Sequence, residues 1–177
     1  MVPRPRTIVT EHLILRPFED ADVDALFAVL GNAAAMRYTH VATSREECRH
    51  RLRAFAALES ALGFAPWTVR QRADERIVGW GGLGIDPFEP GWGVEVSYFF
   101  DPTAWGRGYA TELVRASLGH GFGALHLPLV HAFARPENLA SIRVLEKCGF
   151  VWLGYEPSLE RNHYEARDPS CPTREAS

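Results

Sequence analysis

The stretch WGRGYATEL, residues 105–113, carries the strongest signal in the chain. Gly106 and Gly108 flank Arg107 and stand directly before a segment of good helix-forming residues. Glycine tolerates positive φ and lets a ligand approach the backbone closely. The first N–H groups of a helix have no partner within the helix and lie at the positive end of its dipole. The stretch therefore predicts an anion site, best suited to phosphate or pyrophosphate.

Three known phosphate-binding loops do not match this stretch. The P-loop requires a lysine after its last glycine, and here Tyr109 follows Gly108. The dinucleotide fingerprint requires a third glycine where Thr111 stands, and no acidic residue lies between Glu112 and Glu137 to bind a ribose. A protein-kinase loop requires the same third glycine together with HRD and DFG motifs, which the sequence lacks.

The composition is typical of an ordinary globular protein. The 177 residues predict a single domain over residues 1–167 and a loose polar tail over 168–177. A net charge of −3 argues against nucleic acid as a partner, and no apolar run approaches the ~20 residues of a membrane span. The three cysteines form no CxxC pair and the seven histidines no paired spacing, so we expect no metal and free thiols. Free thiols, with no secretory signal, predict a cytoplasmic protein.

Hydrophobic periodicity predicts the element order β-α-α-β-β-β-α-β-α-β-β. Antiparallel strands in the middle and helical crossovers on either side predict an α+β fold layered α/β/α. Ser44 and Glu47 predict a capping box, and Asn138 predicts the N-cap of the last helix. The expected strands are 12–18, 66–71, 75–85, 93–100, 128–134, 150–155 and 161–166, and the expected helices are 19–31, 44–63, one from about 108, and 138–149.

Residues 105–110 resemble the diphosphate loop of the GNAT acetyltransferases, Gln/Arg-x-x-Gly-x-Gly/Ala. The match falls on Gly108 and Ala110, with Trp105 at the first position. The segments TEHLILRPFEDAD, NAAAMRY, VEVSYFFDP and PENLASIRVLEKCGF resemble further motifs of the same family, in the same order. The chain looks most like the RimJ/RimL type of ribosomal-protein N-terminal acetyltransferase. This resemblance implies a mixed, mostly antiparallel sheet of about seven strands, with a splayed central pair and about four helices.

The resemblance also implies acetyl-CoA as co-substrate and acetyl transfer to an amine by direct attack in a ternary complex. The loop would bind the pyrophosphate, and the end of strand 93–100 would pair with the pantetheine arm. Two interpretations of Asn138 stay open: it lies near the cofactor, or it serves only as the N-cap of the helix. The residues expected at the cofactor are Phe99, Phe100, Trp105, Gly106, Arg107, Gly108, Tyr109, Ala110, Thr111 and Asn138.

Two residues are candidates for catalysis. Glu95 is expected to act as general base, directly or through a water, unless it is an exposed strand glutamate. Many family members carry a tyrosine where this chain has Leu145, and Ser141 is expected to hydrogen-bond the leaving thiolate instead, unless it is an inert helix residue. An α-amino group, of pKa about 7.7–8.0, is partly neutral at pH 7 and so favours an N-terminal acceptor over lysine, of pKa about 10.4.

The acceptor itself is left open by the sequence: a protein N-terminus, a polyamine, an antibiotic or another small amine. Ser97 replaces a glycine usual in the family's EIGYW segment and would narrow the space near the acetyl group. A CoA-binding sensor that has lost catalysis is the alternative function, and both a monomer and a homodimer remain open. Residues expected at the acceptor are Met36, Arg37, Tyr38, Phe88 and Trp92, although Phe88 and Trp92 would also serve simply to cover the sheet.

Overall fold

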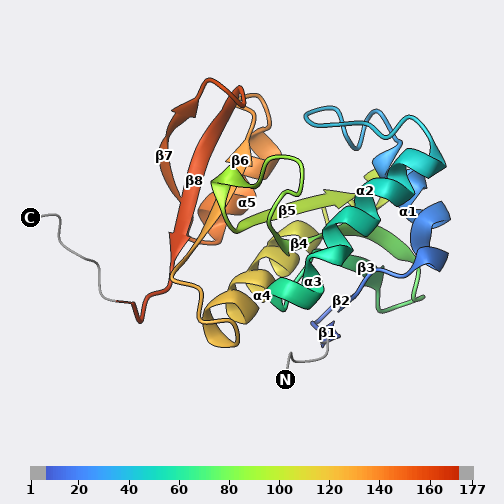
Figure 1. The fold of residues 1–177 in the computed structure, drawn as a ribbon, viewed down its shortest axis with the longest axis horizontal. Helices are drawn as coiled ribbons and strands as arrows, with labels where there is room; N and C mark the ends of the chain where they lie inside the picture. The colour runs from blue at the N-terminus through green and yellow to red at the C-terminus, as the bar shows by residue number, and fades with distance from the viewer. Residues whose placement is uncertain (1–6, 172–177) are drawn as a thin grey trace, which may run out of the picture.

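A single mixed sheet of eight strands organises the protein, which we describe from a computed structural model over residues 7–171. The strand order is β1-β2-β3-β4-β5-β6-β8-β7, and only β5 and β6 run parallel. Figure 1 shows the two ends of this sheet far apart, with β7 and β8 at one side and β1 to β3 at the other. The strands are β1 Ile8–Val9, β2 Leu13–Arg16, β3 Trp67–Gln71, β4 Ile77–Gly84, β5 Glu95–Phe100, β6 Leu129–Ala134, β7 Val151–Glu156 and β8 Arg161–Arg167.

Helices cover both faces of the sheet, as the predicted α/β/α layering requires. They are α1 Val23–Leu30, α2 Arg45–Ala57, α3 Glu59–Leu62, α4 Tyr109–Gly123 and α5 Leu139–Lys147. Short 3₁₀ turns lie at Asp20–Asp22, Pro90–Trp92 and Pro102–Ala104. No helix within residues 7–171 is long and apolar enough to cross a membrane.

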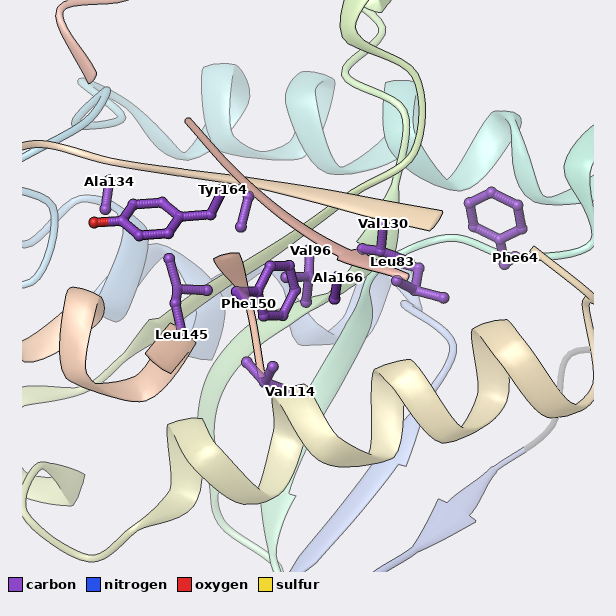
Figure 2. Packing of buried hydrophobic residues seen from close by; sticks show 11 residues of the cluster. Phe64, Leu83, Val96, Val114, Val130, Ala134, Leu145, Phe150, Tyr164 and Ala166 are labelled. Atoms are coloured by element: carbon purple, nitrogen blue, oxygen red, sulfur yellow. The ribbon is translucent and has the colours of Figure 1, made fainter. Parts of the chain in front are cut away.

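The alternation of side chains along β5 divides the core between the two faces. On one face Val96 packs with Val114 of α4 and Leu145 of α5, and Figure 2 shows the Phe150 ring among them. On the other face Phe99 stacks on Trp80, with ring centroids 6.2 Å apart, beneath α1 and α2. The predicted two-faced strand is therefore confirmed, and each face has its own layer of helices.

Strands β5 and β6 form the splayed central pair. One residue pair is in register, Glu95 with His131, and the His131 N–H donates to the Val94 carbonyl at 2.9 Å. Both strands continue for several residues past this pair without further ladder register. The gap that opens between them lies at their carboxyl ends, beside the turn at residues 105–108.

Several local predictions need correction. The sequence pattern missed β1, because two residues are too few to show alternation. The predicted helix over 44–63 is interrupted at Leu58, and its last turn is the separate α3. The Ser44 hydroxyl accepts the Glu47 N–H at 3.1 Å, but the Glu47 carboxylate accepts the Thr43 N–H and hydroxyl instead of the Ser44 N–H.

The beginning of the predicted tail is held against the sheet. The Asp168 N–H donates to the Pro128 carbonyl at 3.0 Å, and the Asp168 carboxylate accepts the N–H of Ser170 at 2.8 Å. Residues 172–177, on which the rest of that prediction falls, lie outside the described residues.

Candidate active site

The turn before α4 has the backbone conformation that its glycines predict. Gly106 and Gly108 adopt φ of +74° and +78°, and Gly108 is the N-cap of α4. A Cβ added at either glycine would meet no atom within 4 Å. The glycines are therefore required by positive φ rather than by crowding, and open space lies beside both of them at the start of the helix.

The side chains of this turn anchor it to the sheet. Tyr109 is buried and its hydroxyl donates to Gln71 Oε1 at 3.1 Å, while the Arg107 guanidinium donates to the same oxygen at 3.3 Å. The Trp105 indole N–H donates to the Phe100 carbonyl at 3.0 Å, although half of the Trp105 side chain stays exposed. The side chains of the turn are therefore occupied by contacts with the sheet, and the Arg107 charge is directed toward β3.

A second anchor holds the first turn of α4 against the N-terminal strands. The Glu112 carboxylate accepts the His12 N–H at 2.7 Å and the Thr10 hydroxyl. Although partial burial opposes them, these hydrogen bonds hold the pKa of Glu112 below its ordinary value. Glu112 thus fixes the position of the helix end that faces the open space.

A cleft of about 680 Å³ joins this turn to the gap between β5 and β6. Its walls include Val96 to Phe100 of β5 and Ala132 to Ala134 of β6. Arg107, Phe88 and Trp92, predicted for the site, are not among the residues that line it. The predicted site residues that do line it are Met36, Arg37, Tyr38, Glu95, Phe99, Phe100, Trp105, Gly106, Gly108, Tyr109, Ala110, Thr111, Asn138 and Ser141.

Glu95 lies at the end of the cleft where β5 and β6 still pair. Burial raises its pKa to about 7, the negative charge of Asp86 adds to this, and the positive charge of Arg161 opposes it. Asp86 and Arg161 line the same cleft. The site therefore contains a half-buried carboxyl group that exchanges a proton near neutral pH, which suits a general base.

Ser141 is held in the cleft by contacts from two directions. The Asn138 side-chain oxygen accepts the Ser141 N–H at 3.2 Å, so the predicted N-cap of α5 is confirmed. The Ser141 hydroxyl lies 2.7 Å from the hydroxyl of Tyr98. From the sequence, Tyr98 is assigned only to the apolar face of β5. A phenol on such a face requires a polar partner, and this requirement could have identified Tyr98 as a residue of the site.

The segment between α1 and α2 supplies the three lining residues that the sequence predicts for the acceptor. Met36 is buried among α1 and α2, whereas Tyr38 reaches across to the last helix segment, where its hydroxyl donates to the Glu137 carbonyl at 3.3 Å. The Arg37 guanidinium lies 4.4 Å from the centre of the Tyr38 ring and donates to its hydroxyl. The segment thereby connects the part of the cleft wall near α1 to the residues just before α5.

The loop between β4 and β5 packs at its two ends against different elements. The Phe88 ring lies 4.4 Å from the Arg51 guanidinium of α2. The Trp92 ring meets Phe133 of β6 edge-on, at 5.1 Å between centroids. The Trp92 contact matches the alternative in which these residues cover the sheet, whereas Phe88 contacts a helix. Within residues 7–171 no three histidine, cysteine or acidic side chains gather where they could hold a metal ion.

Comparison with known proteins identifies the family. The family described as the acetyltransferase (GNAT) domain matches residues 12–151. The chain belongs to the GNAT acetyltransferases. This GNAT chain is 31% identical over 144 residues to the uncharacterized N-acetyltransferase YoaA of Bacillus subtilis, covering 80% of each protein.

Solved GNAT structures share the fold of this chain at low sequence identity. RimL, a ribosomal L7/L12 α-N-protein acetyltransferase solved with coenzyme A, superposes with a TM-score of 0.76 at 22% identity, over 92% of this chain and 98% of RimL. The aminoglycoside acetyltransferase AAC(6')-Ib, solved with ribostamycin and coenzyme A, gives 0.73 at 16% identity, over 89% of this chain and 94% of that enzyme. Because enzymes with such different acceptors fit similarly well, the fold does not distinguish the RimJ/RimL branch within the family.

Proposed function

We propose that this protein transfers the acetyl group of acetyl-CoA to a primary amine by direct attack within a ternary complex. The observation that carries the proposal is that the Gly106–Gly108 turn and the Glu95 carboxyl group lie on one cleft. The turn suits a diphosphate, because its two left-handed glycines and the first residues of α4 line the cleft. When bound, acetyl-CoA supplies an activated thioester to this cleft.

The chain offers two sets of backbone groups to the cofactor. The N–H groups of residues 106–111 face the space expected to hold the diphosphate. Beyond Glu95, the edge of β5 toward β6 is free of ladder pairing, so the backbone near Phe99 can pair with the amides of the pantetheine arm. Asn138 and the exposed Trp105 ring border the same space.

Glu95 is proposed as the group that receives the proton of the attacking amine, directly or through a water. A base must be ionised to act, and a pKa of about 7 leaves Glu95 largely ionised at slightly alkaline pH. The same pKa makes it a stronger base than an ordinary carboxylate. An acceptor α-amine, of pKa about 7.7–8.0, would be partly neutral over the same range.

For the acceptor, a protein or peptide N-terminus is our first proposal and an aminoglycoside-like small amine the second. The RimL and AAC(6')-Ib comparisons support one class each. The segment Met36–Tyr38 at the cleft mouth is the proposed acceptor contact. The proposed compartment is the cytoplasm.

A panel of amines with acetyl-CoA, followed by release of free thiol, tests the proposal. N-terminal peptides, aminoglycosides and simple amines should separate the acceptor classes, and Glu95→Gln should lower turnover at least about tenfold with the best of them, roughly 1.4 kcal/mol in barrier. Glu59→Gln is the matched control, because burial also raises the pKa of Glu59 but this residue does not line the cleft.

The same assay addresses the non-catalytic alternative, which is favoured by Leu145 at the position where the family resemblance implies a tyrosine. Binding of acetyl-CoA without turnover of any amine would support a CoA sensor. Absence of acetyl-CoA binding would contradict both functions.

A further inference from the structure

Two hydroxyl groups from different elements meet on the wall of the cleft. The Tyr98 hydroxyl, on β5, lies 2.7 Å from Ser141 Oγ and 3.3 Å from the Ser141 carbonyl oxygen on α5. Both residues line the cleft. The pair therefore joins the strand at one side of the β5–β6 gap to the helix that covers it.

The phenol has a single proton to donate, and of the two Ser141 oxygens that face it, Oγ at 2.7 Å is nearer than the carbonyl oxygen at 3.3 Å. Chemistry favours the same direction. A phenol, of pKa about 10, is more acidic than an alcohol and is the better donor, while the alcohol oxygen is the better acceptor. With Tyr98 donating to Ser141 Oγ, the serine proton cannot point back at Tyr98 and is free to point into the cleft. A hydroxyl that accepts one hydrogen bond also becomes a stronger donor in the next.

We propose that Tyr98 is a positioning residue that directs the Ser141 hydroxyl to donate a hydrogen bond to the departing sulfur of coenzyme A. The proposal rests on the acetyltransferase function proposed above. In the transfer, the amine nitrogen forms its bond to the acetyl carbon and loses a proton to Glu95. The carbon–sulfur bond breaks, the sulfur keeps the electron pair, and the two hydroxyls keep their protons.

The pair acts as a hydrogen-bond donor and not as an acid. Burial raises the pKa of Tyr98 well above its ordinary value, so the phenol stays protonated while the sulfur departs. A thiol is far more acidic than an alcohol, with a pKa of about 8.5 for cysteine and somewhat higher for other alkyl thiols, so its thiolate can leave without a proton from the protein. The hydrogen bond from Tyr98 through Ser141 would thus stabilise the departing thiolate, a role that a tyrosine at position 145 would otherwise fill in part.

Binding of coenzyme A and of desulfo-coenzyme A, measured by calorimetry at about pH 10, isolates the sulfur contact because a large share of the free thiol is ionised there, the pKa of an alkyl thiol lying above the ~8.5 of cysteine. Calorimetry is preferable to an absorbance titration because the titratable Cys148 and Tyr164 lie near Tyr98. We expect the wild-type protein to bind coenzyme A about tenfold more tightly than the desulfo analogue, the advantage of a hydrogen bond to a charged group. Tyr98→Phe should reduce this ratio to about threefold, and Ser141→Ala should abolish it.

The double variant decides between positioning and packing. If Tyr98 acts through Ser141, the double variant Tyr98→Phe, Ser141→Ala should behave like Ser141→Ala alone. The two proteins should share the same ratio of coenzyme A affinity to desulfo-coenzyme A affinity and the same kcat, with KM for acetyl-CoA little changed. Tyr164→Phe is the matched control: it removes a phenol from the same side of the core, shown in Figure 2, but outside the cleft. It should keep the wild-type ratio.

Equal binding of coenzyme A and its desulfo analogue to the wild-type protein would overturn the inference and leave the acetyltransferase proposal standing. Additive effects of the two substitutions would overturn it as well. If neither compound bound, the acetyltransferase proposal itself would fail.

Discussion

Replacing Glu95 by glutamine should make the folded protein more stable while making it a poorer enzyme. Glutamine has the shape of the protonated glutamic acid but never ionises, so it removes the burial of a negative charge near Asp86. The folded-state pKa of Glu95 is about 7 against an ordinary value of 4.5. The difference is about 2.5, and at about 1.4 kcal/mol per pKa unit it corresponds to about 3 kcal/mol of unfolding free energy.

The sign of this effect depends on pH. Between 4.5 and 7 the folded protein binds the Glu95 proton more tightly than the unfolded chain does, so Glu95 destabilises the fold progressively as pH rises. Urea unfolding at about pH 4 should therefore give similar stabilities for the wild type and Glu95→Gln, whereas at about pH 8 the variant should be more stable by about 3 kcal/mol. Turnover should fall in the same variant, a trade-off expected at a site that stores an unfavourable charge.

Glu112→Gln provides a control of opposite sign. The hydrogen bonds from His12 and Thr10 hold the pKa of Glu112 below its ordinary value, so its stabilising contribution is present above the unfolded pKa and is lost as pH falls through the folded one. Glu112→Gln should thus be less stable than wild type at about pH 8. If Glu95→Gln were only as stable as the wild type at both pH values, or less stable than the wild type at the higher, the assignment of Glu95 as a base with a pKa raised by burial would be wrong.

Further predictions concern the turn and one buried ion pair. Gly108→Ala should lower acetyl-CoA affinity in calorimetry and cost about 1 kcal/mol of stability, because its φ is +78°. Gly119→Ala, within the same helix and without an atom within 4 Å of its added Cβ, should instead stabilise by up to about 1 kcal/mol, and equal losses in both variants would contradict the role of positive φ. Asp22→Ala should lower the free energy of unfolding at pH 7 by about 3 kcal/mol, because it leaves the Arg16 charge without its partner. Arg16 Nη2 lies 2.6 Å from the Asp22 carboxylate. Because hydrogen bonds from Arg16 and Thr68 outweigh burial and lower the pKa of Asp22, this loss should shrink as pH falls below about 4, and a cost independent of pH would refute it.

The features that local sequence encodes were predictable. Alternation along β5 places Val96 and Phe99 on opposite faces, because side chains of a strand alternate. The positive φ of Gly106 and Gly108 follows from glycine before a helix, and Asn138 caps α5 because its side chain competes for backbone N–H groups at a helix start. Each of these depends only on neighbours within a few residues.

The features that the sequence could not supply arise from contacts between distant segments. Arg107, beside two glycines, was expected at the phosphates, yet its guanidinium meets Gln71, 36 residues earlier in the chain. The Tyr98–Ser141 contact joins residues 43 apart. The raised pKa of Glu95 depends on Asp86 from a loop and is moderated by Arg161 from β8. No local pattern reports which distant side chains the fold will bring together.

A crystal structure of the protein with bound coenzyme A tests most directly whether the turn before α4 is a diphosphate site. We expect the two phosphates to accept hydrogen bonds from backbone N–H groups of residues 106–111, with the pantetheine arm entering the gap between β5 and β6. A complex in which the diphosphate lies elsewhere, with this turn in contact only with solvent, would contradict the proposed function at its foundation.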